Sequence, residues 1–251
     1  LFEFVLGDIY ARWFRNEYNV RFNVGLDENG TKILRKAIEL NISVDKYLDD
    51  NNIIWKTFTE KFQISYDIFY RTSTDEHYKK VQELWNYYVQ NGDIFKKEYT
   101  AKYCVGCETF KTDKDLVNNK CVDHSNLDIE TVTEENYFFN LGKYKNSILK
   151  WLETNPITPT HVQNELLGFL EEYTEISISR KKTNLTLGVP VPNDSDQVIY
   201  VWLDATQNYI ISAEEYWGCK TLQLCGRDNT RFQAQIFQCF VAAQNKKHTD
   251  K

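Results

Sequence analysis

Three cysteines and a histidine follow a spacing that is typical of a small metal site. Cys104 and Cys107 form one pair, and Cys121 and His124 form a second, in the pattern C-x2-C-x13-C-x2-H. Each pair can reach one ion from a tight turn, and two pairs complete a tetrahedron of sulfur and nitrogen around Zn²⁺. Because four protein ligands leave no open coordination position, the pattern predicts a structural zinc ion rather than a catalytic one.

A disulfide framework and chance spacing are the competing interpretations of this cluster. The other cysteines, Cys219, Cys225 and Cys239, lie far along the chain. No charged and then apolar leader precedes a small-residue cleavage site, so the sequence gives no indication of an oxidising compartment. We therefore favour zinc at the first cluster and interpret the three remote cysteines as buried thiols.

The composition is that of a globular protein. With 251 residues and 42% hydrophobic content, the chain can bury a substantial core. No apolar run approaches the ~18 residues that cross a bilayer, and a net charge of -6 argues against wrapping DNA with the whole surface. We expect a soluble, cytoplasmic protein that binds neither membrane nor DNA. Short basic runs, such as residues 180–182, fit either a local basic patch or a solvated face.

Strand, turn and helix patterns occur in that order on both sides of a middle region of different character. Residues 19–25 are predicted to form a strand that leads through a polar turn into a helix from Thr31. Residues 198–203 and 221–225 are predicted to be strands that precede two further helices. This order predicts an α/β fold with one doubly wound parallel sheet, in which ligands bind at the carboxyl ends of the strands.

Apolar residues at helical spacing predict several more helices, over residues 1–17, 44–62, 77–90, 143–153 and 162–173. The first carries an apolar stripe of Leu1, Val5, Ile9 and Trp13. Residues 94–179 otherwise contain short strand-like pieces and the cysteine cluster. We interpret this region as an insertion into the sheet.

Several short segments together resemble one enzyme family. YCVGCETF, EENYFFNLGKY, NELLGFL, ISISR, GVPVP, YVWLDATQNY and CGRDN occur in the order found in methionyl-tRNA synthetases, and the resemblance extends from Leu1 to about Ala243. It implies the class I synthetase fold, a Rossmann-like nucleotide-binding domain with a parallel sheet, split by a connective insertion that carries a zinc knuckle. The expected division is residues 1–97 and 193–251 for the two catalytic halves and 98–192 for the insertion.

The resemblance also implies a reaction. L-methionine would be activated by ATP with Mg²⁺ to methionyl adenylate and then transferred to tRNA(Met), as a methionine-tRNA ligase does in translation. The alternative is a non-catalytic zinc-knuckle module that binds tRNA or other RNA on a synthetase-like body. The family's His-Ile-Gly-His motif would end immediately before Leu1 and its KMSKS loop would follow Lys251, so we expect the 251-residue chain alone to be inactive.

The resemblance assigns Asp27 to the catalytic site, as the carboxylate that faces the substrate's ammonium group. A carboxylate just past a strand end suits that role, although Asp27 is also a candidate N-cap for the helix from Thr31. Trp202, Ala205 and Tyr209 match the methionine pocket, where aromatic rings suit a polarizable thioether. Taken alone, a tryptophan in a predicted strand is more often a core residue.

The last matching segment supplies the remaining site residues. Gly226, Arg227 and Asp228 match the Gly-Lys-Asp turn that holds ATP, with arginine in place of the usual lysine. Asn229, Gln233 and Phe237 match further methionine-pocket positions and, being four apart, are predicted to share one helix face. The family usually has histidine at Gln233 and at Asn29, and this difference motivates the non-catalytic alternative.

Overall fold

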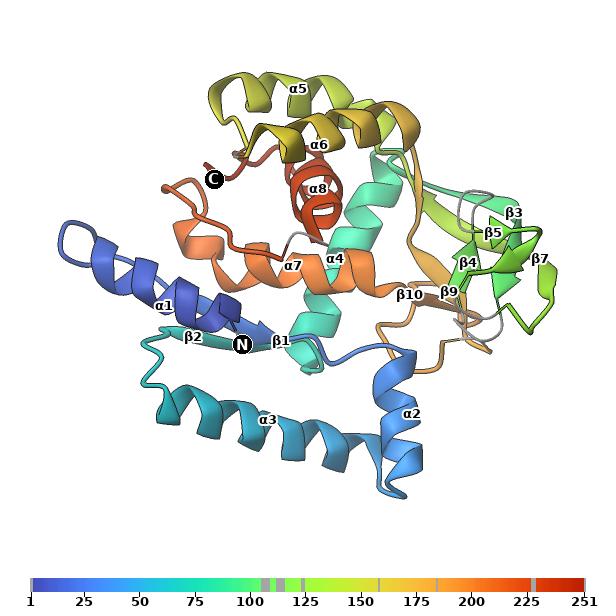
Figure 1. The fold of residues 1–251 in the computed structure, drawn as a ribbon, viewed down its shortest axis with the longest axis horizontal. Helices are drawn as coiled ribbons and strands as arrows, with labels where there is room; N and C mark the ends of the chain where they lie inside the picture. The colour runs from blue at the N-terminus through green and yellow to red at the C-terminus, as the bar shows by residue number, and fades with distance from the viewer. Residues whose placement is uncertain are drawn as a thin grey trace.

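The computed structural model describes residues 2–104, 109–111, 116–122, 125–157, 159–183, 185–226 and 229–250 (Figure 1). Its helices are α1 Phe2–Phe14, α2 Thr31–Glu39, α3 Val44–Lys61, α4 Asp75–Gln90, η2 Gly142–Tyr144, α5 Lys145–Thr154, α6 Thr160–Glu172, α7 Val201–Ser212, η3 Glu214–Tyr216, the π-helix η5 Phe232–Ile236 and α8 Phe237–Ala243. Its strands are β1 Asn23–Leu26, β2 Ile68–Arg71, β3 Ile94–Cys104, β4 Thr109–Lys111, β5 Leu116–Val117, β6 Lys120–Cys121, β7 Ile129–Phe139, β8 Ile176–Ser177, β9 Ser179–Lys181 and β10 Gln197–Ile199.

Strands β1 and β2 pair in parallel, and the chain crosses between them through α2 and α3. Helix α7 packs against both strands. A Cβ added to Gly25 of β1 would lie 3.2 Å from the Tyr70 carbonyl oxygen, so glycine here avoids a tight contact with the neighbouring strand β2, while Asn208 Oδ1 of α7 would be at an ordinary 3.7 Å. The predicted parallel arrangement is confirmed for this pair, although β1 begins at Asn23 rather than at Asn19.

Helix α1 forms where the apolar spacing predicts it, but the buried face is a different one. Gly7, Asp8 and Ala11 are buried, whereas Ile9 is 58% exposed and Trp13 is 72% exposed. The Asp8 carboxylate accepts two hydrogen bonds from the chain just before β2. Helix α1 therefore packs through these polar contacts and through the stacking of Phe4 on Trp55 of α3, and not through the predicted apolar stripe.

The main hydrophobic core lies between α4, β7, α5, α6 and α8. At its centre the Phe240 ring meets the Phe139 ring nearly at right angles, with ring centroids 4.7 Å apart, and Tyr88 packs edge-on against Phe139 at 5.4 Å. Trp151 of α5 and Leu166 of α6 belong to the same buried cluster. The helices of the middle region therefore share one core with α4 and α8. Within the described residues no helix is both long and apolar enough to cross a membrane.

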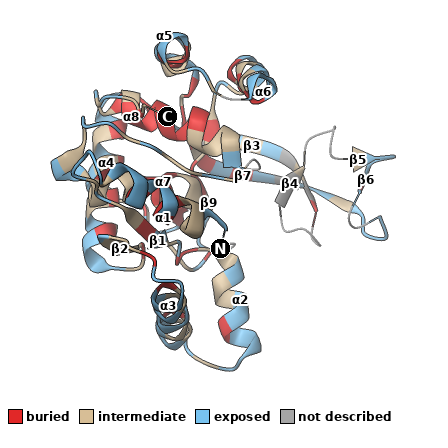
Figure 2. Cartoon of the chain, turned by 60° about the vertical axis from the view of Figure 1, so that its left-hand side comes forward, coloured by how far each residue is buried: buried red, intermediate tan, exposed pale blue. Residues whose placement is uncertain are grey.

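Strands β3 and β7 form a long antiparallel hairpin that extends away from the helices, with β5 and β6 at its far end (Figure 2). They pair along all 11 residues of each strand, and β4 and β8 add to the same sheet. The sequence predicts only short strand-like pieces here. The outer part is rich in Lys, Glu and Thr, which face each other across the ladder, as the Thr100 and Thr133 hydroxyls do at 2.9 Å. Because these residues are mostly polar, the strands show no alternation of apolar and polar residues by which they could be predicted.

The predicted strand over residues 198–203 is mostly wrong. Strand β10 ends at Ile199 and pairs antiparallel with β9, and α7 begins at Val201, so Trp202 lies on a helix. A short apolar run does not distinguish a buried strand from a buried helix. Asp204 in the first helical turn favours the helix, because a negative charge there complements the helix dipole.

The predicted strand over residues 221–225 is absent. The Thr221 N–H donates to Asp250 Oδ2 at 2.9 Å, and the Asp250 N–H donates to the Thr221 carbonyl at 3.1 Å. Thr221 therefore pairs with Asp250, and the segment joins none of the sheets of the described residues. Within the described residues, the parallel sheet is the β1 and β2 pair rather than a doubly wound sheet extended by later strands.

Candidate functional site

A cavity of about 710 Å³ opens at the carboxyl end of β1. The chain from β1 into α2 forms one wall, α7 forms the second, and the segment around η5 forms the third. The cavity brings together most of the residues predicted to bind methionine, namely Asp27, Trp202, Ala205, Tyr209, Asn229 and Gln233. A ligand site at a strand's carboxyl end is the expected place for a parallel α/β fold.

Asp27 lies directly after β1 and lines the cavity. The alternative that it caps α2 is wrong, because the N-cap is Gly30 with φ 116° and no side chain caps this helix. Asp27 Oδ1 instead accepts a 3.4 Å bond from the Asn29 N–H. The cavity walls enclose this carboxylate while leaving it open to solvent inside the cavity. That burial, and then the charge of Asp204, raises the pKa of Asp27 to about 7.

The opposite wall is aromatic. The Trp202 ring packs edge-on against Phe232 with centroids 5.3 Å apart, and Trp202 also packs against the main core. The Tyr209 hydroxyl accepts a 3.2 Å hydrogen bond from Gln233 Nε2, and burial raises the pKa of Tyr209, so this hydroxyl stays protonated. Trp202 therefore packs against the core and also lines the cavity, so its position is compatible with both a core role and a pocket role.

Of the predicted pocket residues Asn229, Gln233 and Phe237, only the first two line the cavity. Asn229 and Gln233 line the cavity, whereas Phe237 is fully buried behind it and packs against Tyr209 at 5.4 Å. Gln233 and Phe237 both contact Tyr209, so they lie toward the same residue but at different depths. Gln233 lies within the π-helix η5, whose wider turn changes the angle between it and Phe237 from that of an α-helix.

Two cations also line the cavity, Lys32 of α2 and Arg231. The Arg231 guanidinium lies 3.5 Å from the centroid of the Tyr173 ring and 6.0 Å from that of Trp202. Its Nε is buried and makes no hydrogen bond to any described residue. A charged donor in this position is suited to an anionic group of a ligand.

The predicted nucleotide turn is described only at its first residue. The Gly226 carbonyl accepts a 2.9 Å hydrogen bond from the N–H of Asn229, which lines the cavity. The turn therefore begins at the cavity wall. Arg227 and Asp228 lie outside the described residues, so their predicted contacts with ATP stay predictions.

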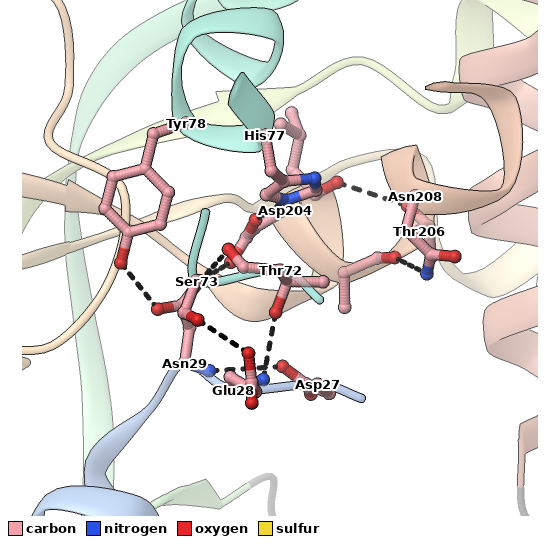
Figure 3. Close-up of polar contacts among 12 residues, drawn as sticks. Asp27, Glu28, Asn29, Thr72, Ser73, His77, Tyr78, Asp204, Thr206 and Asn208 are labelled. Atoms are coloured by element: carbon pink, nitrogen blue, oxygen red, sulfur yellow. Dashed lines mark hydrogen bonds and ion pairs between the residues drawn. The ribbon is translucent and has the colours of Figure 1, made fainter. Parts of the chain in front are cut away.

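A buried polar network lies beside the cavity and was not predicted from the sequence (Figure 3). The Asp204 carboxylate accepts from Asn29 Nδ2 at 2.7 Å and contacts His77 Nε2 at 2.6 Å. The Tyr78 hydroxyl donates to Asn29 Oδ1 at 2.8 Å, and the Tyr70 hydroxyl lies 3.0 Å from His77 Nδ1. The only sequence signal for this network is an acid, Asp204, within an apolar run.

A second set of contacts holds the residue between Asp27 and Asn29. Glu28 is 3% exposed, and its carboxylate accepts a bifurcated hydrogen bond from the Arg71 Nε–H, at 2.9 and 3.0 Å to its two oxygens, and one from the Ser73 hydroxyl at 2.6 Å. Its N–H donates to the Thr72 hydroxyl at 2.9 Å. The loop that carries Asp27 is therefore fixed by its neighbours on both faces, which favours a preorganised site.

Two of the four predicted zinc ligands are described. Cys104 ends β3 and Cys121 lies in β6, and both thiols are buried, which fits ligands of a structural ion. Cys107 and His124 lie outside the described residues. Among the described residues no group of three or more potential ligands occurs, so the zinc site stays a prediction.

The three remote cysteines differ from one another. Cys239 is buried as predicted, and burial raises the pKa of its thiol. Cys219 and Cys225 are exposed, so the prediction of buried thiols is wrong for them. Cys219 lies just before residues 221–226, which form no strand, and Cys225 lies within them.

Comparisons with known proteins agree on one family. The family model described as tRNA synthetases class I (M) matches residues 1–128 and 111–251. The methionine--tRNA ligase of Campylobacter jejuni is 34% identical over 251 residues, which cover 94% of this chain and 40% of that protein. Methionine--tRNA ligase 1 of Bacillus cereus is 38% identical over 263 residues, which cover 95% and 39%. The chain thus spans about two fifths of the length of these relatives.

Solved structures show the same similarity. Mycobacterium tuberculosis methionyl-tRNA synthetase in complex with methionyl-adenylate matches with a TM-score of 0.86 and 29% identity, over 99% of this chain and 52% of that one. The apo form of the same enzyme matches with a TM-score of 0.78 and 28% identity, over 99% and 50%.

Proposed function

Because the chain belongs to the methionine-type class I tRNA synthetases, we propose that it is the part of a methionine-tRNA ligase that activates L-methionine with ATP. The observation that carries the proposal is the cavity itself. One cavity combines a carboxylate at a strand end with an aromatic wall and a cation, and each suits one part of an amino acid. A solved relative that matches over 99% of this chain is in complex with methionyl-adenylate, and this also supports the proposal.

The ammonium, thioether and carboxylate groups of methionine would each contact a different wall of the cavity. The Asp27 carboxylate would accept the ammonium group, and the rings of Trp202 and Tyr209 would pack against the thioether. The Gln233 amide, which hydrogen-bonds Tyr209, would help to fix that wall. Arg231 lines the same cavity and would receive a carboxylate or phosphate oxygen.

The nucleotide would bind beside this pocket. We propose that Gly226, Arg227 and Asp228 hold the adenosine of ATP, which enters with Mg²⁺. The methionine carboxylate would attack the α-phosphate and pyrophosphate would leave, so the protein supplies orientation and charge stabilisation and needs no nucleophile of its own. Transfer of methionine to tRNA(Met), in the cytoplasm, completes the proposed reaction. The non-catalytic RNA-binding alternative is not favoured, since the curated relatives are named as ligases.

The test is methionine-dependent exchange between ATP and pyrophosphate, measured on the intact gene product. We expect L-methionine to stimulate exchange, and Trp202→Ala to lower kcat/KM for methionine roughly tenfold or more, because a large ring is lost from the pocket wall. Trp55→Ala is the matched control, since Trp55 stacks on Phe4 and does not line the cavity. Stimulation by a different amino acid alone, or equal effects of the two substitutions, would contradict the proposal.

We also propose that Cys104, Cys107, Cys121 and His124 hold one structural zinc ion within the insertion, residues 98–192. The ion would hold together the far end of the β3 and β7 ladder, where few of the described apolar side chains are buried. Elemental analysis of protein prepared without chelators should give one zinc per chain, and Cys121→Ser should abolish it. Zinc-free protein, or full zinc content in the variant, would remove the assignment.

A further inference from the structure

Asp204 is a buried carboxylate that the proposed reaction does not use directly. It lies in the first turn of α7 between Trp202 and Ala205, which line the cavity, but its own side chain is 0% exposed and does not. Burying a carboxylate is costly unless hydrogen bonds compensate for the lost water. The hydrogen-bond partners of Asp204 therefore indicate its role in the structure.

Both carboxylate oxygens of Asp204 have a partner. Burial raises the pKa of Tyr70 to about 12, so its hydroxyl stays protonated and can donate to Nδ1 of His77. The other ring nitrogen, Nε2, then carries the proton that it donates to Asp204 Oδ1 at 2.6 Å. Asn29 Nδ2 donates to Oδ2 at 2.7 Å. Asp204 thus links α4 and α7 to the loop after β1.

Asn29 carries this link to Asp27. Burial raises the pKa of Tyr78 to about 12, so its hydroxyl donates to Asn29 Oδ1, and Asn29 Nδ2 also reaches the Thr72 carbonyl at 3.3 Å. The Asn29 side chain is therefore held on three sides. Its own N–H contacts the Asp27 carboxylate two residues earlier, so fixing Asn29 fixes Asp27 against the wall that α7 supplies.

Charge is the second connection between the two acids. The negative charge of Asp204 is the largest cause, after burial, of the raised pKa of Asp27. Glu28 of the same loop also acts on Asp27, and the other titratable or charged groups that line the cavity are Lys32 of α2, Tyr209 of α7 and Arg231 before η5. Glu28 is paired with Arg71, which leaves Asp204 as the main anion acting on Asp27.

We propose that Asp204 is a positioning residue, which acts through Asn29 to hold the Asp27 carboxylate at the cavity and, through its charge, makes ammonium binding there depend on pH. The inference rests on the proposed function in one respect, that the ligand of Asp27 is the ammonium group of an amino acid. Ammonium binding needs ionised Asp27. Affinity should therefore fall as the pH drops through about 7, and less steeply so once Asp204 is neutralised.

Asp204→Asn tests the charge with the hydrogen bonds kept. Its amide oxygen can accept from Asn29 Nδ2, and its NH₂ can donate to His77 Nε2 if the ring changes tautomer and donates from Nδ1 to Tyr70. With the nearby anion gone, the pKa of Asp27 should fall from about 7 toward its ordinary value. Asp75→Asn is the control, because it removes an exposed acid of α4 that does not act on Asp27.

The measurements are carboxyl ¹³C titration of Asp27 by NMR in the ligand-free chain, and methionine affinity by calorimetry. For wild type and Asp75→Asn, affinity at about pH 8 should exceed that at about pH 6 roughly tenfold, and for Asp204→Asn only about twofold. An unchanged Asp27 titration in Asp204→Asn would overturn the charge effect. Absence of methionine binding at any pH in wild type would instead reject the proposed function, and the ligand-free titration would still decide the inference.

Asn29→Ala tests the positioning. It should lower methionine affinity about tenfold or more and leave the affinity for desamino methionine unchanged, because that analogue has no ammonium group to place against Asp27. Equal weakening of both ligands would mean that Asn29 and Asp204 only maintain the fold, and would overturn the positioning role.

Discussion

Asp27→Asn should remove most of the methionine affinity. Truncating the charge of one partner in an enclosed ion pair costs ~2–5 kcal/mol, so the dissociation constant should rise roughly thirtyfold or more. The weak binding that remains should no longer vary between about pH 6 and pH 8, because the group whose pKa is raised to about 7 is gone. Calorimetry over that pH range measures both effects.

The same substitution should not harm the fold. The pKa of Asp27 lies above its ordinary value of 3.8, so its contribution to the free energy of unfolding is full at acid pH and is lost as the pH rises through about 7. At about pH 8 the variant should therefore melt no lower than wild type. Affinity close to the wild-type value would contradict the assignment, and a lower melting temperature would mean that Asp27 has a structural role instead.

Phe240→Ala should lower the free energy of unfolding more than Asp27→Asn or Trp13→Ala. The ring is fully buried in contact with Phe139 and Tyr88, where α8, β7 and α4 meet. Removing a buried phenylalanine of this kind lowers the free energy of unfolding by ~3–5 kcal/mol, through lost apolar burial and the cavity left behind. Urea denaturation followed by tryptophan fluorescence measures the change, provided that the transition is two-state.

Trp13→Ala is the comparison for that measurement. Trp13 is also aromatic but is 72% exposed on α1, so its removal should change the free energy of unfolding by no more than about 0.5 kcal/mol. A loss at Phe240 as small as that at Trp13 would show that the aromatic cluster does not anchor the hairpin and α8.

The helices were the most predictable part of the fold. Helix α3 begins at the predicted residue, Val44, and α4 begins two residues before the predicted start at His77, because each has a regular apolar spacing and a definite stop. The run 198–203 was not predictable in this way, since strand and helix are equally consistent with six apolar residues. The strand predicted over residues 221–225 does not form, and Thr221 pairs instead with Asp250, 29 residues further along the chain. A local sequence pattern contains no information about such a contact.

In the candidate site, too, residues in short local segments could be predicted, whereas residues linked by long-range contacts could not. Asp27, Trp202 and Tyr209 could be assigned from the sequence through a resemblance that rests on short, ordered segments. The Asn29, His77 and Asp204 network could not, because the hydrogen-bonded pairs are separated by 127 and 175 residues. Periodicity indicates which face of an element is apolar, but it contains no information about which buried polar groups meet.

The π-helix η5, Phe232–Ile236, separates two parts of one helical segment that face different surroundings. Before it, Asn229 and Arg231 line the cavity, and after it, the rings of Phe237 and Phe240 are buried in the interior. Shortening the chain there by one residue would restore ordinary pitch and swing the upstream part by roughly 100°. Gln233 would then leave the space beside Tyr209, so insertions and deletions at this point should be far less tolerated than substitutions.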